Sequence, residues 1–287
     1  GYTADRWILQ GSGGSVRFRK HALSATMVNA WGVGQGALIT TTTTTGALQW
    51  QQRIEGLRKF SGKDVPLSLG ISAQEVGTYT FKLRAIFGTG GSASVFIGTA
   101  NYVNASSYDV DVFEHTFSIP DLTGYTFGTG DYLQLEVYFG SDTLAIANNN
   151  IYLSRVQLEE GSFATEYEQK PIGTELNLCQ RYLPYHESGE LYGYVGYGVA
   201  LNTTITRIVI EFENDSRITP TSLSWAGNFE LYDGTATFAV TAIAVATGGN
   251  TKKAVLDVLA SGLTAKQLYI LRNANDASAY IEIPTEL

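Results

Sequence analysis

Residues 79–87 read Tyr-Thr-Phe-Lys-Leu-Arg-Ala-Ile-Phe, and this stretch decides the fold class. Every odd-numbered position in it is apolar, while Thr80, Lys82 and Arg84 stand between the apolar residues. A period of two is the spacing of a β-strand that buries one face, because successive side chains of a strand point to opposite sides. The stretch therefore predicts a strand with one face in a hydrophobic core and the other in solvent.

The same alternation returns along the chain. Residues 133–139 place Gln134 and Glu136 between apolar positions, and residues 208–212 and 236–240 alternate in the same way. Clusters of Gly, Asn, Asp and Ser separate these stretches. Many short strands divided by turn residues are typical of an all-β sandwich or barrel. We therefore predict an all-β fold.

Helical spacing is scarce in this sequence. Trp50, Ile54 and Leu57 stand at i, i+4 and i+7, which is the spacing of one helix face. This pattern predicts a short helix over residues 48–58.

The single cysteine, Cys179, lies in a second segment with helical spacing. We predict a short helix over residues 176–183 that is ended by Pro184 and that buries Cys179. One cysteine cannot form a disulfide within the chain, so a disulfide framework is excluded.

The chain has 287 residues, a comfortable length for two domains. A Gly- and Pro-containing stretch between residues 161 and 175 marks the expected boundary. We predict a first β-sandwich over 1–170, a connector over 171–185 and a smaller C-terminal β-domain over 186–287.

The formal net charge is −8, and only 16% of the residues are charged. An acidic chain without a basic stripe is not expected to bind nucleic acid. No stretch approaches the roughly 20 apolar residues of a membrane span, so we expect no membrane insertion. The chain begins at Gly1 without a methionine, and we expect more protein upstream.

Catalytic motifs are missing from the sequence. His21, His115 and His186 are not spaced as zinc ligands with one another or with the cysteine. There is no Gly-x-Ser-x-Gly nucleophile motif and no phosphate-binding loop. We predict that the chain is not an enzyme and that it has no catalytic residues.

Two carboxylates, Asp109 and Asp111, stand two positions apart and are expected on one face of a strand. Such a pair faces solvent or supplies part of a Ca²⁺ shell, which needs six to eight oxygen ligands. They are the candidate metal ligands of a chain for which we otherwise predict no cofactor.

The aromatic residues are the more informative set. Tyr and Trp present flat apolar faces with a polar group, and sugar rings stack on such faces. Five of them lie in polar, loop-like settings and are the predicted ligand contacts, with core or interface packing as the alternative: Trp31, Tyr102, Tyr108, Trp225 and Tyr232.

Other aromatic residues are predicted to have structural roles. Trp7 and Trp50 are assigned to the core. Tyr192, Tyr194 and Tyr197 alternate with glycines and are expected to pack between subunits, because small neighbours permit close approach of chains.

Several segments carry a resemblance to a known family. Residues 2–7 (YTADRW) and 51–65 resemble the start and middle of a carbohydrate-binding-module-like sandwich that is common near the ends of phage tail fibres. Residues 156–168 resemble the closing strand and exit of that module.

Two later segments resemble the C-terminal part of phage tail proteins that carry this sandwich. Residues 175–182 (ELNLCQRY) resemble the segment that leads from the sandwich into a C-terminal tip domain. Residues 217–221 (RITPT) resemble the Arg-x-x-Pro-Thr turn of the tip, although Ser216 stands where a methionine is usual.

The resemblance implies a jelly-roll-like sandwich, a receptor-binding tip and a place in the virion. A homotrimer attached to upstream tail-fibre segments would bind host surface polysaccharide or lipopolysaccharide. Two alternatives remain open: a carbohydrate-binding module of a secreted polysaccharide-active enzyme, and a fragment of a tailspike-type depolymerase.

Overall fold

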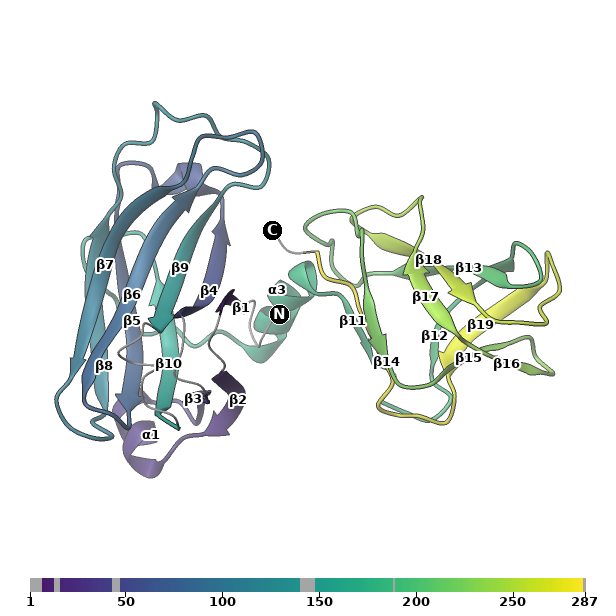
Figure 1. Ribbon diagram of the computed structural model, residues 1–287, viewed down its shortest axis with the longest axis horizontal. Helices are drawn as coiled ribbons and strands as arrows, with labels where there is room; N and C mark the ends of the chain where they lie inside the picture. The colour runs from purple at the N-terminus through teal and green to yellow at the C-terminus, as the bar shows by residue number, and fades with distance from the viewer. Residues whose placement is uncertain (1–6, 13–15, 43–46, 140–147, 188, 286–287) are drawn as a thin grey trace. The chain divides into compact units, whose positions relative to one another are not determined.

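The computed structural model describes residues 7–12, 16–42, 47–139, 148–187 and 189–285. The chain divides into two compact units, Gly1–Gln169 and Lys170–Leu287. Both are built almost wholly of antiparallel strands (Figure 1). The all-β prediction is confirmed.

The first unit is a jelly-roll-like sandwich of two five-stranded sheets. The first sheet has the order β1-β4-β9-β6-β7, and the second has the order β2-β3-β10-β5-β8. The strands are β1 (Trp7–Ser12), β2 (Val16–Ala22), β3 (Gln35–Thr41), β4 (Ala47–Glu55), β5 (Asp64–Ala73), β6 (Gly77–Ile86), β7 (Val95–Asn104), β8 (Asp111–Ser118), β9 (Tyr132–Phe139) and β10 (Asn150–Leu158).

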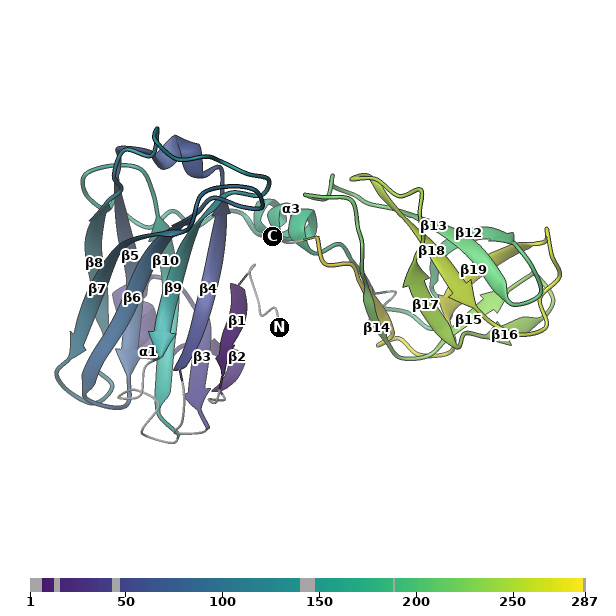
Figure 2. The same ribbon diagram turned by 45° about the horizontal axis from the view of Figure 1, so that its top comes forward.

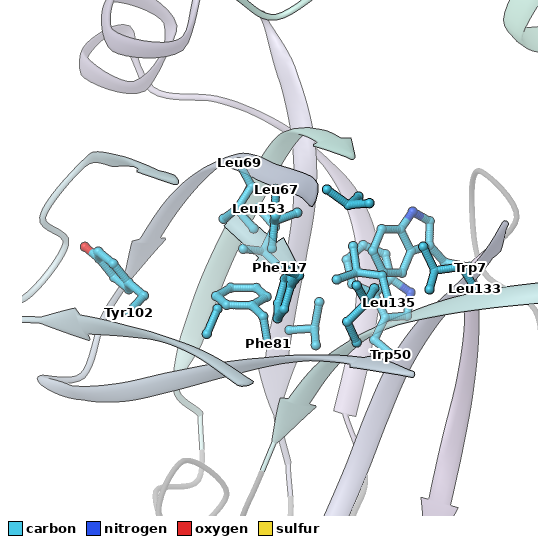
Figure 3. Packing of buried hydrophobic residues seen from close by; sticks show 14 of the residues in the cluster. Trp7, Trp50, Leu67, Leu69, Phe81, Tyr102, Phe117, Leu133, Leu135 and Leu153 are labelled. Carbon is cyan, nitrogen blue, oxygen red and sulfur yellow. The ribbon is translucent and has the colours of Figure 1, made fainter. Parts of the chain in front are cut away.

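The core of this unit lies between the two sheets and is filled by the alternate apolar residues of each strand. Trp7 and Trp50 stack with their ring centroids 3.9 Å apart, which confirms their assignment to the core. Tyr102 lies at the opposite end of the same cluster (Figure 3). Residues between these apolar positions face outward and form the outer faces of the sheets.

A short helix, α1 (Ala25–Trp31), packs on the outer face of the second sheet. It lies against that sheet in both views (Figure 1 and Figure 2). The hydroxyl of Ser24 caps its first turn by accepting a hydrogen bond from the Met27 N–H. The Trp31 ring fits against Gly70, where a Cβ atom would lie only 2.7 Å from the ring. The glycine thus makes room for the helix.

The helix predicted over 48–58 is wrong. Strand β4 occupies Ala47–Glu55 and is followed by a 3-10 turn, η2 (Leu57–Phe60). The reason is that Trp50 and Ile54, four positions apart, share a face in a strand as well as in a helix. The polar residues between them, Gln51 and Arg53, mark the strand.

The second unit contains a seven-stranded and a three-stranded sheet, in the orders β16-β15-β19-β12-β13-β18-β17 and β11-β20-β14. Its core is built from apolar residues of both sheets. The strands are β11 (Tyr185–Glu187), β12 (Tyr194–Ala200), β13 (Ile205–Glu211), β14 (Ser224–Ala226), β15 (Phe229–Tyr232), β16 (Thr237–Ala239), β17 (Ala242–Val245), β18 (Lys253–Leu259), β19 (Leu268–Asn273) and β20 (Tyr280–Glu282).

The helix predicted around Cys179 is confirmed as α3 (Ile172–Tyr182). The burial of Cys179 is not, because its side chain is partly exposed. Ile172 and Leu176 are also exposed, and within α3 only Tyr182 is buried. In the described part of the chain, no helix combines the length and apolar character needed to cross a membrane.

Candidate functional site

The outer face of the first sheet carries an ordered row of polar side chains. Glu136 on β9 stands opposite Gln51 on one neighbouring strand and opposite Lys82 on the other. Lys82 in turn stands opposite Thr99. Residues that face one another across an antiparallel pair point to the same side of the sheet. These four side chains therefore lie on one surface, named here the polar face.

Two acceptor atoms at the centre of the polar face are buried and have no donor among the residues that the structure describes. Glu136 is 1% exposed, and its Oε1 accepts hydrogen bonds from Arg84 Nε (2.9 Å) and Gln134 Nε2 (2.7 Å). Gln51 is 2% exposed, and its Nε2 donates to Gln49 Oε1 at 2.6 Å. Among the described residues, Glu136 Oε2 and Gln51 Oε1 have no hydrogen-bond partner. A buried acceptor left unpaired costs about 1–3 kcal/mol, which a donating ligand would recover.

Aromatic rings and cationic side chains surround these acceptors. Lys82 Nζ lies 3.3 Å from the ring centroid of Tyr138. The surface thus offers buried acceptors at its centre, charged donors beside them and ring faces nearby. This combination suits a polyhydroxylated ring, whose hydroxyls donate and accept and whose C–H groups pack on aromatic faces. Two further cation–ring pairs flank it: Arg53 with Tyr132, and Arg84 with Phe96.

A second candidate lies on the outer face of the second sheet, beside α1. This α1 cleft has a volume of about 310 Å³. Tyr152 is its central ring, with the His21 ring centroid 5.5 Å away and that of Tyr108 6.3 Å away. Burial raises the pKa of Tyr152, as does the neighbouring Tyr108, while Arg19 opposes the rise. The lining residues are His21, Ser24, Thr26, Met27, Tyr108, Val110 and Tyr152.

Tyr108 reaches the α1 cleft from an unusual backbone conformation. Its φ of 58° lies in the left-handed region, which is strained for a bulky residue. Its N–H donates to the Ala73 carbonyl at 2.8 Å, and its hydroxyl donates to Gln74 Oε1 at 3.0 Å. The side chain remains 44% exposed. Of the five predicted ligand contacts, Tyr108 is the one that lines this cleft.

Trp31 and Tyr102 lie close to the same turn but are both buried, Trp31 beneath α1 and Tyr102 in the sandwich core. Trp31 is 2% exposed, and its Nε1 donates to the Asp111 carbonyl at 3.0 Å. The buried Tyr102 hydroxyl donates to Asp111 Oδ2 at 2.8 Å. Burial and this hydrogen bond raise the pKa of Tyr102. Both side chains are buried and packed inside the first unit, as in the alternative that the sequence left open.

Trp225 and Tyr232 lie in different sheets of the second unit and are not brought together. Trp225 is partly exposed and packs edge-on against Phe229, with ring centroids 6.0 Å apart. The Tyr232 hydroxyl donates to the Gly234 carbonyl at 2.6 Å, and Arg272 lies 4.0 Å from its ring centroid. Both residues therefore have partners within their own unit.

Asp109 and Asp111 do not share a strand face as predicted. Strand β8 begins at Asp111, and Asp109 lies in the turn before it. Asp109 Oδ1 accepts from the Val110 N–H at 3.1 Å, whereas Asp111 accepts from Tyr102. No cluster of three or more His, Cys, Asp or Glu side chains able to hold a metal occurs in the ranges that the structure describes.

Sequence reasoning missed the centre of the polar face. The alternation did place Gln134 and Glu136 on the outward side of their strand, but that side was assigned to solvent. The helix predicted over 48–58 also concealed Gln51. The available signal was the coincidence of polar outward positions on several strands, which becomes visible only once their order in the sheet is known.

Neither a protein-family model nor a curated protein matches the chain. Several solved structures are distantly similar. The enzymatically active domain of bacteriophage CBA120 tailspike protein 4 has 14% identity and a TM-score of 0.36, covering 54% of this chain and 19% of that chain. This chain thus spans about a fifth of that tailspike chain.

Two further structures are carbohydrate-binding modules. The family 11 carbohydrate-binding module from Clostridium thermocellum has 13% identity and a TM-score of 0.33, covering 53% of this chain and 88% of that chain. The N-terminal CBM22-1-CBM22-2 tandem domain from Paenibacillus barcinonensis Xyn10C has 11% identity and a TM-score of 0.34, covering 99% and 94%. These likenesses are too distant to assign a family.

Proposed function

We propose that the chain is a non-enzymatic adhesion module of a phage tail fibre and that its polar face binds a host-surface glycan. The observation that carries the glycan site is the pair of buried acceptors, Glu136 Oε2 and Gln51 Oε1, which have no donor within the described residues. Sugar hydroxyls are donors of the right kind. The phage assignment is supported by the resemblance of residues 156–168 and 175–182 to tail-fibre segments.

On binding, contacts that Lys82 makes within the protein would be replaced by contacts between the protein and the sugar. Lys82 lies over the Tyr138 ring and stands next to Glu136 on the neighbouring strand, on the same face of the sheet. Its flexible stem allows it to swing aside, which exposes both the ring and the carboxylate. A sugar ring would then stack on Tyr138, and one of its hydroxyls would donate a hydrogen bond to Glu136 Oε2. The displaced Lys82 ammonium group would donate a hydrogen bond to another hydroxyl of the sugar.

A single shallow site of this kind binds weakly, because each hydrogen bond adds only about 0.5–1.5 kcal/mol net. Three copies held together would raise the apparent affinity through effective concentration. The proposed homotrimer is supported by an exposed apolar surface in the second unit, where Tyr197 and Val209 face one another across β12 and β13. Val199 and Leu268 extend that surface. Light scattering should give three times the chain mass, and a monomer would contradict the trimer.

The glycan site is tested by cell labelling with the purified chain. We expect wild-type protein to label host bacteria and to lose that labelling when the surface polysaccharide is removed. Lys82→Ala and Gln51→Leu should each weaken glycan binding about tenfold, the equivalent of one charge-assisted or buried hydrogen bond. Lys59→Ala, which removes an exposed lysine from η2, is the matched control and should bind as wild type.

Three results would redirect the proposal. Equal labelling of stripped cells would indicate a protein receptor. Glycan binding by a monomer without preference for particular cells would favour a module of a secreted polysaccharide-active enzyme. Release of new reducing ends from host polysaccharide would show a depolymerase.

A further inference from the structure

Helix α1 covers only part of the outer face of the second sheet. Strand register places two further rows of outward-facing residues beside it, in which Leu38 is buried among its neighbours. In the nearer row, Arg19, Leu38 and Tyr152 stand opposite one another on successive strands. In the next row, Arg17 and Thr40 occupy the corresponding positions. Both arginines alternate with the core-facing Val16 and Phe18, so their side chains leave the outer face of the sheet.

The second row continues as a fixed hydrogen-bonded chain. Thr40 Oγ1 donates to Asn150 Oδ1 at 2.7 Å, and Asn150 Nδ2 donates to Gln74 Oε1 at 3.1 Å. The Tyr108 hydroxyl donates to the same Gln74 oxygen at 3.0 Å. The chain therefore holds these groups, and the strained Tyr108, in place before any ligand arrives. Groups that need no rearrangement on binding lose little entropy.

Two cationic side chains, Arg17 and Arg19, lie on the outer face beside the cleft, although the chain has a formal net charge of −8. Arg17 and Arg19 are exposed, and neither forms an ion pair with any residue that the structure describes. The carboxylates of Asp109 and Glu75 accept hydrogen bonds from the Val110 N–H and from Gln74 Nε2 at 3.4 Å, and no ion pair joins either of them to an arginine in the described part of the chain. Unpaired guanidinium groups bind carboxylate and phosphate oxygens in bidentate fashion.

We infer that the α1 cleft, together with Arg17 and Arg19, is a second ligand site that takes a sugar carrying a carboxylate or phosphate group. The sugar ring lies against Tyr152 and Tyr108, and its anionic group meets the two guanidinium groups. The site goes beyond the proposed function, because it lies on the opposite sheet from the polar face and demands a charged ligand. Through this second site the module would recognise the anionic groups of an acidic host polysaccharide, whereas the polar face would recognise only hydroxyl groups.

The test is a binding screen with oligosaccharides in matched pairs. Each uronic-acid oligosaccharide is paired with its carboxyl-reduced form, and each phosphorylated one with its dephosphorylated form. Wild-type protein should prefer the charged member of at least one class, and that preference should decline as salt rises. Arg17→Gln and Arg19→Gln should each weaken binding of that member about tenfold, whereas Arg19→Lys, which keeps the charge, should lose less.

Lys20→Gln is the matched control, because it removes a cation from the same strand on the alternate side. It should leave the preference intact, and circular dichroism with thermal melting should show that all variants are folded. Inorganic phosphate and galacturonate, used as competitors, distinguish the two anionic groups, and at least one should displace the bound oligosaccharide.

The outcomes separate this site from the polar face. Lys82→Ala and Gln51→Leu should leave the charge preference unchanged, since they lie on the other sheet. Equal binding of both members of every pair, or wild-type affinity in the double variant Arg17→Gln/Arg19→Gln, would overturn the inference while leaving the proposed function intact. If the protein prefers the charged oligosaccharides but neither Lys82→Ala nor Gln51→Leu changes its binding of any glycan, the proposal that the polar face binds glycan would be overturned instead.

Discussion

The outer face of the second sheet in the first unit and the outer face of the seven-stranded sheet in the second unit differ in chemistry. In the first unit, the outer face of the second sheet is polar and is partly roofed by α1, which creates a cleft. In the second unit, the seven-stranded sheet presents Tyr197, 70% exposed, together with Val199, Val209 and Leu268. A cleft with fixed hydrogen-bonding groups suits a small polar ligand. A set of exposed apolar side chains on neighbouring strands suits another protein surface.

The arginines of the two faces sharpen this contrast. In the second unit, Arg207 makes two hydrogen bonds to Asp257, at 2.9 and 3.1 Å, and Arg272 lies 2.7 Å from Glu230. These cations are neutralised across strand pairs and support the sheet. Arg17 and Arg19 of the first unit have no such partner within the described chain. The same residue type thus stabilises one face and is available to a ligand on the other.

The largest expected effect is a loss of stability when the packing of α1, which covers the cleft, is disrupted. Trp31→Ala should lower the free energy of unfolding of the first unit by about 3–5 kcal/mol, because it removes a large buried ring and leaves a cavity. Urea denaturation measures the loss. Asn29→Ala, an exposed change in the same helix, should alter stability little. A loss from Trp31→Ala as small as that of the control would mean that α1 is not a packed roof.

The next prediction compares the ion pairs of the two units. Arg84→Met should destabilise the first unit by about 1–3 kcal/mol, because it removes a charged donor from the buried Glu136 carboxylate. Arg207→Met should cost clearly less, since its pair with Asp257 is partly exposed and screened by solvent. Guanidinium denaturation of both variants gives the comparison. Equal losses would show that burial does not distinguish the pairs.

A third experiment acts on the apolar surface of the second unit. Tyr197→Ser should raise the concentration needed for self-association about tenfold, because it removes a large exposed ring from the proposed contact. Analytical ultracentrifugation across a concentration series measures the shift. Ile218→Ser, which removes an exposed apolar side chain outside the strands of that sheet, should leave assembly unchanged. Loss of assembly in both variants would locate the contact elsewhere.

The smallest expected effect is a pH dependence confined to the second unit. Burial lowers the pKa of His186, against an opposing effect of Glu213. The unfolded chain then binds a proton more readily than the folded one, so stability should fall as pH drops below the ordinary histidine pKa of about 6.5. Thermal melting between pH 7 and 5 tests this, and His186→Gln should lose that dependence.

Two aspartates of the second unit, Asp233 and Asp276, have their effect outside that pH window. Hydrogen bonds lower the pKa values of Asp233 and Asp276, so their contribution is lost only at more acidic pH. A melting temperature that is equally pH-dependent in His186→Gln would assign the effect to other groups.

The strands could be predicted because their alternation is local and is imposed by one buried face. The error at residues 48–58 arose because a four-residue spacing fits both periods. Trp31 resembled a loop residue among polar neighbours, yet its environment is set by Gly70, which is distant in sequence. The buried state of Glu136 likewise depends on Gln51, Lys82 and Arg84, which come from other strands. The alternation along one strand shows which face of the sheet a residue lies on. Its neighbours on the adjacent strands can be predicted only when the strand order of the sheet is known.

The contact between Gly70 and Trp31 also governs how the first unit can vary. The sheet beneath the helix carries no side chain at position 70, so even one methyl group there would act as a wedge under the indole. The sandwich core lies on the other side of the strand and would be left untouched. A substitution at position 70 would therefore shift α1 and change the width of the α1 cleft, although residue 70 does not line the cleft. The range of sugars that fit could then change while every residue that contacts the sugar stays the same.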